Sequence, residues 1–226
     1  MMETGALLTL LSRGASNDYI GESVSQLEHA LQAANAAKQA EASEILIIAS
    51  LLHDIGHLSE IGKSEVRGLG KEDHEHAGGN IVRAAGLHED IAMLVEMHVD
   101  AKRYLASSTP GYTAKLSSAS KATLDLQGGA MTPSEAEAFR SHRLFKDALR
   151  VRSWDDAAKE HGRVVPTLEH YQAMMRRNQK ESLSKSELLT WSETGFLHLP
   201  NWFDEDEMAR IAEVTDEIER WPETAG

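Results

Sequence analysis

Three observations predict an all-α protein. Apolar residues recur with the spacing of a helix face, no stretch alternates apolar and polar residues as a half-buried strand does, and only five prolines interrupt the chain. A chain of 226 residues is long enough for one ordinary domain and a short appendage. We therefore expect a helical domain over residues 1–183 and a C-terminal tail over residues 184–226.

The individual helices follow from this spacing and from residues suited to helix ends. Segment 24–38 is rich in Ala, Leu and Gln, and Ser25 is a suitable N-cap. Segment 44–57 places apolar residues at i, i+3, i+4 and i+7, which predicts one buried face. The segments after it are, in order, a loop over 58–71, helices over 73–86 (with Asp73 as cap) and 89–105, a turn over 107–115, and helices over 116–126, 133–149, 154–160 and 167–182.

Charge and cysteine content exclude several classes of protein. The formal net charge is −13 and no basic stretch is present, which argues against nucleic acid or an anionic membrane as partner. Without cysteine there are no disulfides, zinc ribbons or thiol catalysis, and this suits a reducing cytoplasm. The N-terminus has no cationic start for a signal peptide, and the apolar run ILIIASLL is far shorter than the roughly 20 residues that span a bilayer. We expect a soluble, cytoplasmic protein.

Histidines and aspartates are placed on the predicted helices in a pattern suited to metal binding. An imidazole offers one nitrogen lone pair, whereas a carboxylate has two oxygens that can each hold a different ion. In the pair His53–Asp54, the histidine would bind one ion and the aspartate would span two. Packed helices can direct further ligands to a common centre. The candidate metal ligands are His29, His53, Asp54, His74, His98 and Asp155.

The other histidines need a separate judgement, because a lone histidine on a helix is more often a core or surface residue than a ligand. His76 lies on a different face of its helix from His74. We leave six histidines outside the site: His76, His88, His142, His161, His170 and His198.

Several longer strings extend the pattern: DYIGESVSQLEHA, ASLLHDIGH, DHEHAG, EMHVDAKRYL, SSASKATLDLQGGAM and RSWDDAAK. Through them, residues 5–180 resemble the HD-domain superfamily. Within it they resemble the mixed-valent diiron oxygenases, above all those that act on 2-amino-1-hydroxyethylphosphonate. The resemblance implies an HD-domain helical bundle with a central diiron site, an Fe(II)/Fe(III) pair, and O₂ as co-substrate. One iron would be held by His29, His53 and Asp155, and the other by His74 and His98, with Asp54 as the bridge.

The resemblance also implies where substrate binds. His57 and Lys102 match positions that contact the phosphonate, and we predict both as catalytic residues. Lys102 lies one helical turn after His98, where a point charge suits a dianion, although without that neighbour a surface lysine would be the simpler interpretation. The remaining matches are Ser120, Thr123 and Gln127 in an anion-binding segment, and Tyr19 and Glu22 in a substrate-sensing loop.

The activity implied by the resemblance is O₂-dependent cleavage of the C–P bond of (R)-2-amino-1-hydroxyethylphosphonate to glycine and inorganic phosphate. A second possible substrate is the trimethylammonium analogue (R)-1-hydroxy-2-trimethylaminoethylphosphonate, which would give glycine betaine. Glu22 suits a primary ammonium group, whereas a quaternary one is usually met by aromatic faces, in which this chain is poor. Two further hypotheses give the chain a different class of function: an HD-type metal-dependent phosphohydrolase, and a non-catalytic HD module.

The C-terminal tail has a different character, with three of the four tryptophans. We expect a short extended segment followed by an acidic helix. The string TGFLHLPNWFDEDEMARI resembles the start of phytanoyl-CoA-hydroxylase-like, 2-oxoglutarate-dependent oxygenases. This suggests a hydroxylase of that class as a partner in the same pathway or the same polypeptide. The competing hypothesis is a tail that merely packs on the helical body.

Overall fold

The structure is a computed structural model that describes residues 4–16, 23–58, 73–179, 185–198, 203 and 205–218. Over these residues the regular structure is helical apart from isolated bridge residues, among them the antiparallel pair Leu87 and Gln179. The predicted all-α fold class is confirmed. No helix among the described residues is both long and apolar enough to cross a membrane.

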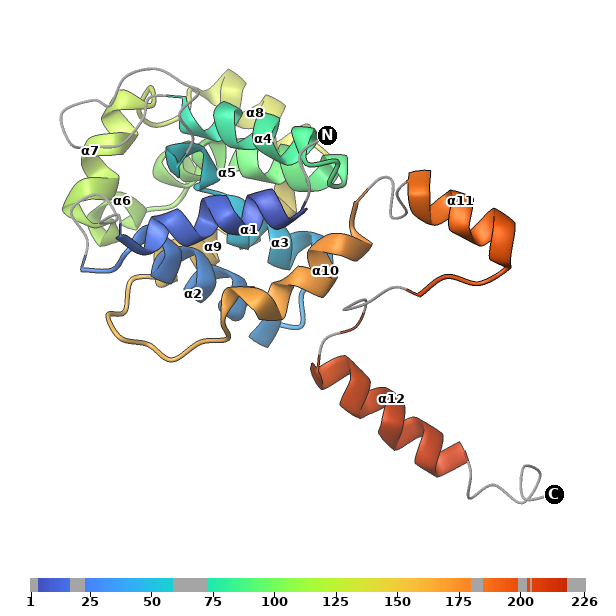
Figure 1. Ribbon diagram of the computed structural model, residues 1–226. Helices are drawn as coiled ribbons and strands as arrows, with labels where there is room; N and C mark the ends of the chain where they lie inside the picture. The colour runs from blue at the N-terminus through green and yellow to red at the C-terminus, as the bar shows by residue number, and fades with distance from the viewer. Residues whose placement is uncertain are drawn as a thin grey trace.

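The helices run along the chain as follows (Figure 1). The α-helices are α1 Thr4–Arg13, α2 Gln26–Gln39, α3 Glu44–Leu52, α4 His74–Ala84, α5 Glu89–Ser108, α6 Tyr112–Lys115, α7 Ser118–Leu126, α8 Pro133–Ser141, α9 Phe145–Ala157, α10 Gln172–Arg177, α11 Lys185–Thr194 and α12 Glu205–Ile218. Three short 3₁₀ segments lie between them: η1 Gly14–Ser16, η2 Ile55–Leu58 and η3 Leu168–Tyr171.

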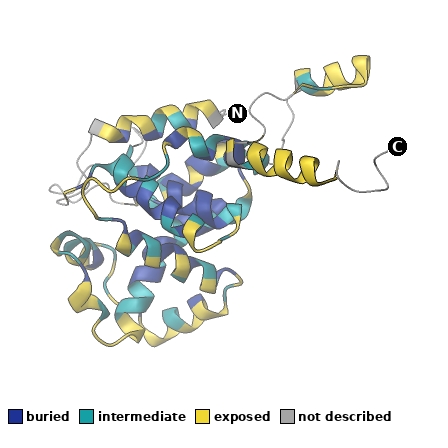
Figure 2. Ribbon diagram, turned by 90° about the horizontal axis from the view of Figure 1, so that it is seen from below, coloured by how far each residue is buried: buried dark blue, intermediate teal, exposed yellow. Residues whose placement is uncertain are grey.

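Helix α5 is the centre of the bundle, because it packs against α3, α4 and α9. Its residues Ile91, Leu94 and Val95 have no exposed surface, and the buried helices form one continuous interior (Figure 2). Helix α2 packs against α3 and α9 and contributes small side chains such as Ala33 and Ala34. Small residues let helix axes approach closely, so polar side chains on these five helices can meet in the interior.

Two of the predicted helix starts have different outcomes. Ser25 caps α2 in a capping box: its side chain accepts from the Glu28 main-chain N–H, and the Glu28 carboxylate accepts from the Ser25 N–H. Asp73 stands at the N-cap position of α4, as predicted, but without a side-chain hydrogen bond to the helix. Its backbone is left-handed (φ 68°), and its carboxylate accepts from His76 Nδ1 instead of from a helix N–H.

Several predicted boundaries also differ from the structure. The helix expected over 44–57 ends at Leu52 and continues as the separate turn η2. The expectation of one helix over 133–149 is wrong, because the chain breaks between α8 and α9 where His142 is extended (ψ 137°). His142 Nδ1 accepts from the Leu144 N–H, a local bond that competes with helix continuation. Of the helix expected over 154–160, only residues 154–157 are helical, and they form the last turn of α9.

The tail forms two helices, α11 and α12, which Figure 1 shows standing away from the bundle. The acidic helix expected there is α12. Helix α11 was not expected, and residues 196–198, between the two helices, are not helical. Arginine–glutamate pairs join the tail to α10, from Arg176 to Glu187 at 2.8 Å and from Arg177 to Glu207 at 2.6 Å. The domain division at residue 183, and the resemblance of the tail to another oxygenase, remain predictions.

Candidate metal centre and substrate site

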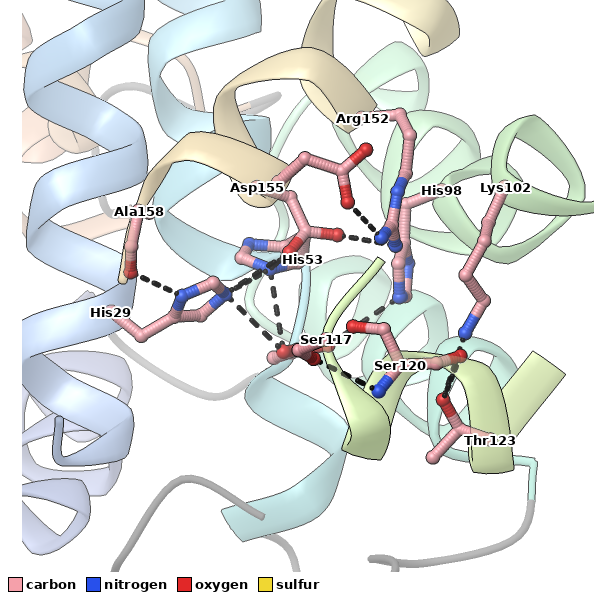
Figure 3. A network of polar contacts seen from close by, with 12 residues as sticks. His29, His53, His98, Lys102, Ser117, Ser120, Thr123, Arg152, Asp155 and Ala158 are labelled. Atoms are coloured by element: carbon pink, nitrogen blue, oxygen red, sulfur yellow. Dashed lines mark hydrogen bonds and ion pairs between the residues drawn. The ribbon is translucent and has the colours of Figure 1, made fainter. Parts of the chain in front are cut away.

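Four histidines from four parts of the chain point their rings into the middle of the bundle (Figure 3 labels three of them). His29 lies on α2, His53 is the C-cap of α3, His74 begins α4, and His98 lies on α5. All four are at most 6% exposed. Buried polar groups require partners, so the contacts of these rings indicate what the centre is built to hold.

The outer nitrogens of the rings are fixed by main-chain carbonyls. His29 Nδ1 lies 2.8 Å from Ala158 O, His53 Nδ1 lies 2.8 Å from Ser50 O, and His98 Nδ1 lies 2.6 Å from Val95 O. A carbonyl oxygen only accepts, so Nδ1 carries a proton in each of these three rings, and Nε2 is the atom left to bind an ion. The outer nitrogen of His74 faces a carboxylate, with Glu75 Oε2 at 3.3 Å.

The inner nitrogens face each other in two pairs. His29 Nε2 lies 2.9 Å from His53 Nε2, and His74 Nε2 lies 3.2 Å from His98 Nε2. Two facing lone pairs at these distances need a cation or a shared proton between them. Imidazole nitrogens with carboxylates nearby are a donor set that suits iron, manganese or zinc, and the residues present therefore fit a metal centre.

Asp54 lies between the two pairs and offers one oxygen to each. Its Oδ2 atom is 3.3 Å from His53 Nε2 and 3.7 Å from His29 Nε2. Its Oδ1 atom is 3.4 Å from His98 Nε2 and 3.5 Å from His74 Nε2. This division of one carboxylate between two histidine pairs is the arrangement that a bridge between two ions requires.

Asp155, on α9, adds a second carboxylate to the His29–His53 pair, as Figure 3 shows. Its Oδ1 atom lies 3.3 Å from His29 Nε2 and 3.7 Å from His53 Nε2. The structure thus brings together all six residues that the sequence singled out as metal ligands. They divide into a group of His29, His53 and Asp155 and a group of His74 and His98, with Asp54 between the groups.

The cluster strongly perturbs the protonation of its members. Burial raises the pKa of Asp54 and of Asp155, but the facing histidines, and Arg152 beside Asp155, more than offset this and hold both pKa values well below the usual range. Burial lowers the pKa of His53, yet the two carboxylates raise that pKa well above its ordinary value. The centre is thus built around two charged carboxylates, which favour a bound cation.

His57 lies on η2, beside the second histidine pair. Its ring stacks on that of His74 at 3.9 Å between centroids, and its Nε2 atom is 4.0 Å from Asp54 Oδ1. Burial, followed by the charge of His74, lowers the pKa of His57 well below its ordinary value. His57 is therefore neutral at neutral pH and borders the group of His74 and His98.

Lys102 on α5 and Ser120 and Thr123 on α7 lie next to the cluster (Figure 3), and Gln127 is the C-cap of α7. Lys102 Nζ donates to the Thr123 hydroxyl at 3.0 Å, and the Thr123 hydroxyl donates to the Ser120 carbonyl at 3.1 Å. Ser120, Thr123 and Gln127 are spaced so that they share one face of α7. Among the described contacts, the buried Oε1 atom of Gln127 accepts no hydrogen bond.

Two cationic residues of this site escaped the sequence prediction, although both belong to the string RSWDDAAK. Arg152 lies 2.6 Å from Asp155 Oδ2, and Lys159 Nζ lies 3.0 Å from Ser120 Oγ and 3.3 Å from Ser117 Oγ. Their positions three residues before and four residues after Asp155 were the available signal, since residues at these spacings share one face of a helix. In the structure this holds for Arg152, whereas Lys159 lies two residues beyond the end of α9.

The remaining predicted residues are not part of the described cluster. Tyr19 and Glu22 lie outside the described residues. His76 is 64% exposed and pairs with Asp73, which agrees with leaving it out of the site. Four of the other excluded histidines make contacts elsewhere: His88 with the Asp90 N–H, His142 with the Leu144 N–H, His161 with the Ser23 carbonyl and His170 with Lys38.

Comparison with known proteins places this site in a family. The model of the HD-domain family matches residues 23–139. The chain is 39% identical over 162 residues to a hydroxymethylphosphonate dioxygenase of Gimesia maris, covering 71% of this chain and 81% of that protein. It is 36% identical over 169 residues to the [1-hydroxy-2-(trimethylamino)ethyl]phosphonate dioxygenase (glycine-betaine-forming) of Leisingera caerulea, covering 74% and 86%. An uncharacterised protein, L432, of Acanthamoeba polyphaga mimivirus is 35% identical over 184 residues, covering 80% and 84%. The chain belongs to the HD-domain family and, within it, to the group of proteins that includes these phosphonate dioxygenases.

Proposed function

We propose that this protein uses O₂ to cleave the carbon–phosphorus bond of a 1-hydroxyphosphonate, at two iron ions held by the histidine–aspartate cluster. The observation that carries the proposal is the division of the Asp54 carboxylate between two histidine pairs, next to a lysine and hydroxyl groups on α5 and α7. The names of two relatives, both dioxygenases of hydroxyphosphonates, support the substrate class.

The ligand roles follow from the two groups in the cluster. His29, His53 and Asp155 would hold one ion, His74 and His98 the other, and Asp54 both. When bound, the Fe(II)/Fe(III) pair supplies the electrons and the O₂ reactivity that these side chains lack. The protein contributes the ligand geometry and the orientation of the substrate.

Cationic and hydroxyl groups would bind the phosphonate dianion. Lys102 supplies a buried ammonium group, and Ser120 supplies a hydroxyl donor on the same side of the cluster; Thr123 would add a second donor if its hydroxyl turned from the Ser120 carbonyl to the phosphonate. Lys159 brings a second ammonium group to Ser120. Gln127 Oε1, which accepts no bond in the described structure, is available to a donor on the substrate.

His57 would act on the substrate hydroxyl. It is neutral at neutral pH, because burial lowers its pKa, so a ring nitrogen can accept the hydroxyl proton beside the His74 ring. In the overall reaction, one hydroxyphosphonate and one O₂ give one carboxylic acid and one inorganic phosphate, with C1 oxidised from an alcohol to a carboxylate.

For the substituent on C1 we propose a primary aminomethyl group, so that the substrate is (R)-2-amino-1-hydroxyethylphosphonate and the acid is glycine. Glu22 supports this choice, since a carboxylate can accept hydrogen bonds from an ammonium group. The trimethylammonium analogue and hydroxymethylphosphonate are the comparators, because the two relatives are named for them.

The test is an assay of phosphate release by iron-loaded protein with each of the three phosphonates, in air and under anaerobic conditions. We expect one phosphate per O₂ consumed, no release without O₂, and the highest kcat/KM with the aminoethyl substrate. Phosphate release that is indifferent to O₂ would identify a phosphohydrolase and refute the oxygenase. A higher kcat/KM with either comparator would overturn the choice of the primary amine alone.

A further inference from the structure

Arg152 is a buried arginine for which the proposed reaction has no direct use. It lies on α9 and is 3% exposed. A buried guanidinium is costly unless its donors are paired. Its Nη1 atom lies 2.6 Å from Asp155 Oδ2, its Nη2 atom pairs with Asp156 Oδ1, and its Nε atom donates to the Tyr112 hydroxyl at 3.0 Å. Each of the three guanidinium nitrogens of Arg152 therefore has a partner.

The first of these contacts divides the Asp155 carboxylate. Oδ2 faces Arg152, whereas Oδ1 faces the inner nitrogens of His29 and His53 at 3.3 and 3.7 Å. Figure 3 shows Asp155 between Arg152 on one side and the two histidines on the other. Because Arg152 and Asp155 are three residues apart on one helix, the backbone of α9 holds the pair in register.

Tyr112 and Asp156 hold Arg152 in turn. The Tyr112 hydroxyl accepts from Arg152 and donates to Asp156 Oδ2 at 2.7 Å, while Asp156 Oδ1 pairs with Arg152. The arginine can only donate, so the hydroxyl proton must point to Asp156. Burial raises the pKa of Tyr112, which keeps this proton in place. The three side chains form a closed ring, here called the Arg152 lock.

We propose that the Arg152 lock is a positioning device that restricts Asp155 to one-oxygen coordination of its metal ion. A carboxylate free to turn can bind through both oxygens, whereas Asp155 has one oxygen committed to the guanidinium. The coordination position that the second Asp155 oxygen would otherwise take would then remain for a hydroxyphosphonate oxygen. The inference rests on the proposed function and adds residues that neither the ligand set nor the predicted substrate contacts include.

The lock also joins the metal centre to the substrate-binding segment. Tyr112 lies on α6, five residues before Ser117, the N-cap of α7 whose face carries Ser120 and Thr123. Between residues 112 and 126 only Leu116 and Leu124 are buried apolar side chains, and the Arg152–Tyr112 and Lys159–Ser117 hydrogen bonds add polar contacts from α9 and its C-terminal end. Loss of the Tyr112 hydroxyl would therefore alter the position of Arg152 and, through it, the orientation of the Asp155 carboxylate.

Two variants with a matched control test the lock. Tyr112→Phe removes one hydroxyl, and Arg152→Lys keeps the positive charge but loses the planar guanidinium group that bonds Asp155, Asp156 and Tyr112 at once. The control Tyr104→Phe makes the same change in a ring packed between Phe139 and Phe145. The measurements are Fe(II) affinity by competition with a chelator, the electron paramagnetic resonance signal of the partly reduced two-iron protein, and circular dichroism to verify folding.

We expect both lock variants to bind one of their two Fe(II) ions about 10- to 100-fold more weakly, the range found for losses of groups that orient metal ligands, with an altered signal. Tyr104→Phe should match the wild type. Wild-type affinity at both ions and an unchanged signal in folded Tyr112→Phe would overturn the inference, even if Arg152→Lys fails to fold. A wild-type protein that binds two irons but releases no phosphate would refute the proposed function and leave the lock standing.

Discussion

The Nζ atom of Lys102 lies 3.0 Å from the hydroxyl oxygen of Thr123, so a buried ammonium group on α5 is tied to the helix that we propose binds phosphonate. Lys102 is 4% exposed. Burial, followed by the charge of Arg152, lowers the pKa of Lys102 to about 8. The proposed phosphonate-binding charge is therefore lost within an accessible pH range.

This pKa predicts an alkaline limit to substrate capture. As pH rises through about 8, the free protein loses the Lys102 charge, so kcat/KM for the hydroxyphosphonate should fall up to about tenfold per pH unit. Lys102→Arg should remove this limb, because a guanidinium stays charged. The measurement is kcat/KM from pH 6 to 10 for both proteins. An alkaline limb that persists in Lys102→Arg would contradict the assignment.

A second prediction concerns Lys159, whose Nζ atom lies 3.0 Å from Ser120 Oγ. Removal of its charge in Lys159→Met should raise KM for the hydroxyphosphonate about tenfold, with a smaller effect on kcat, since a charge-assisted hydrogen bond contributes about 1.5 kcal/mol or more. Lys121 is the control: it lies on the same helix as Ser120 but is exposed and donates to the Ala114 carbonyl. Equal KM values for Lys159→Met and Lys121→Met would exclude Lys159 from substrate binding.

A third prediction concerns the tight approach of the chain at Gly56, between His53 and His57. A Cβ atom at Gly56 would lie 1.9 Å from the His74 carbonyl oxygen and 2.9 Å from the Gly78 nitrogen, both main-chain atoms. Gly56→Ala should therefore destabilise the fold by about 3 kcal/mol or more and displace His74. The measurements are the free energy of unfolding in urea and the iron content.

The matched control for this change is Gly5→Ala in α1. A Cβ atom there meets nothing within 4 Å, and alanine favours a helix by up to about 1 kcal/mol. If steric contact decides the outcome, Gly56→Ala should lower the free energy of unfolding and Gly5→Ala should raise it. A Gly56→Ala protein as stable as wild type, with full iron content, would show that the start of α4 at His74 can move aside without loss of stability or iron.

The helical fold and the residues of the cluster could be predicted from sequence for a physical reason. Helix-forming segments show their period locally, as 24–38 does with its Ser25 cap. Histidine and aspartate are unusual enough on apolar helix faces that His53–Asp54 draws attention by composition alone. At His142 a local side-chain hydrogen bond competes with the helix, and the spacing of apolar residues does not reveal it. The predicted helix over 133–149 was therefore wrong there.

The parts that could not be predicted depend on contacts between distant segments. Tyr112 reaches Arg152 from 40 residues away, and a tyrosine in a predicted turn carries no sign of that contact. Lys159 resembles an ordinary solvated lysine until α7 is placed beside the end of α9. A sequence pattern reports which face of a helix is buried, but it does not report what the polar residues at its ends will meet.

The central claim is that one carboxylate, Asp54, joins two metal ions. The most direct test is a crystal structure of the iron-loaded protein with anomalous scattering recorded at the iron edge. We expect two iron peaks about 3.5–4 Å apart, one near His29, His53 and Asp155 and one near His74 and His98, with one Asp54 oxygen bound to each. A single peak in fully loaded protein, or two peaks that Asp54 does not connect, would contradict the account.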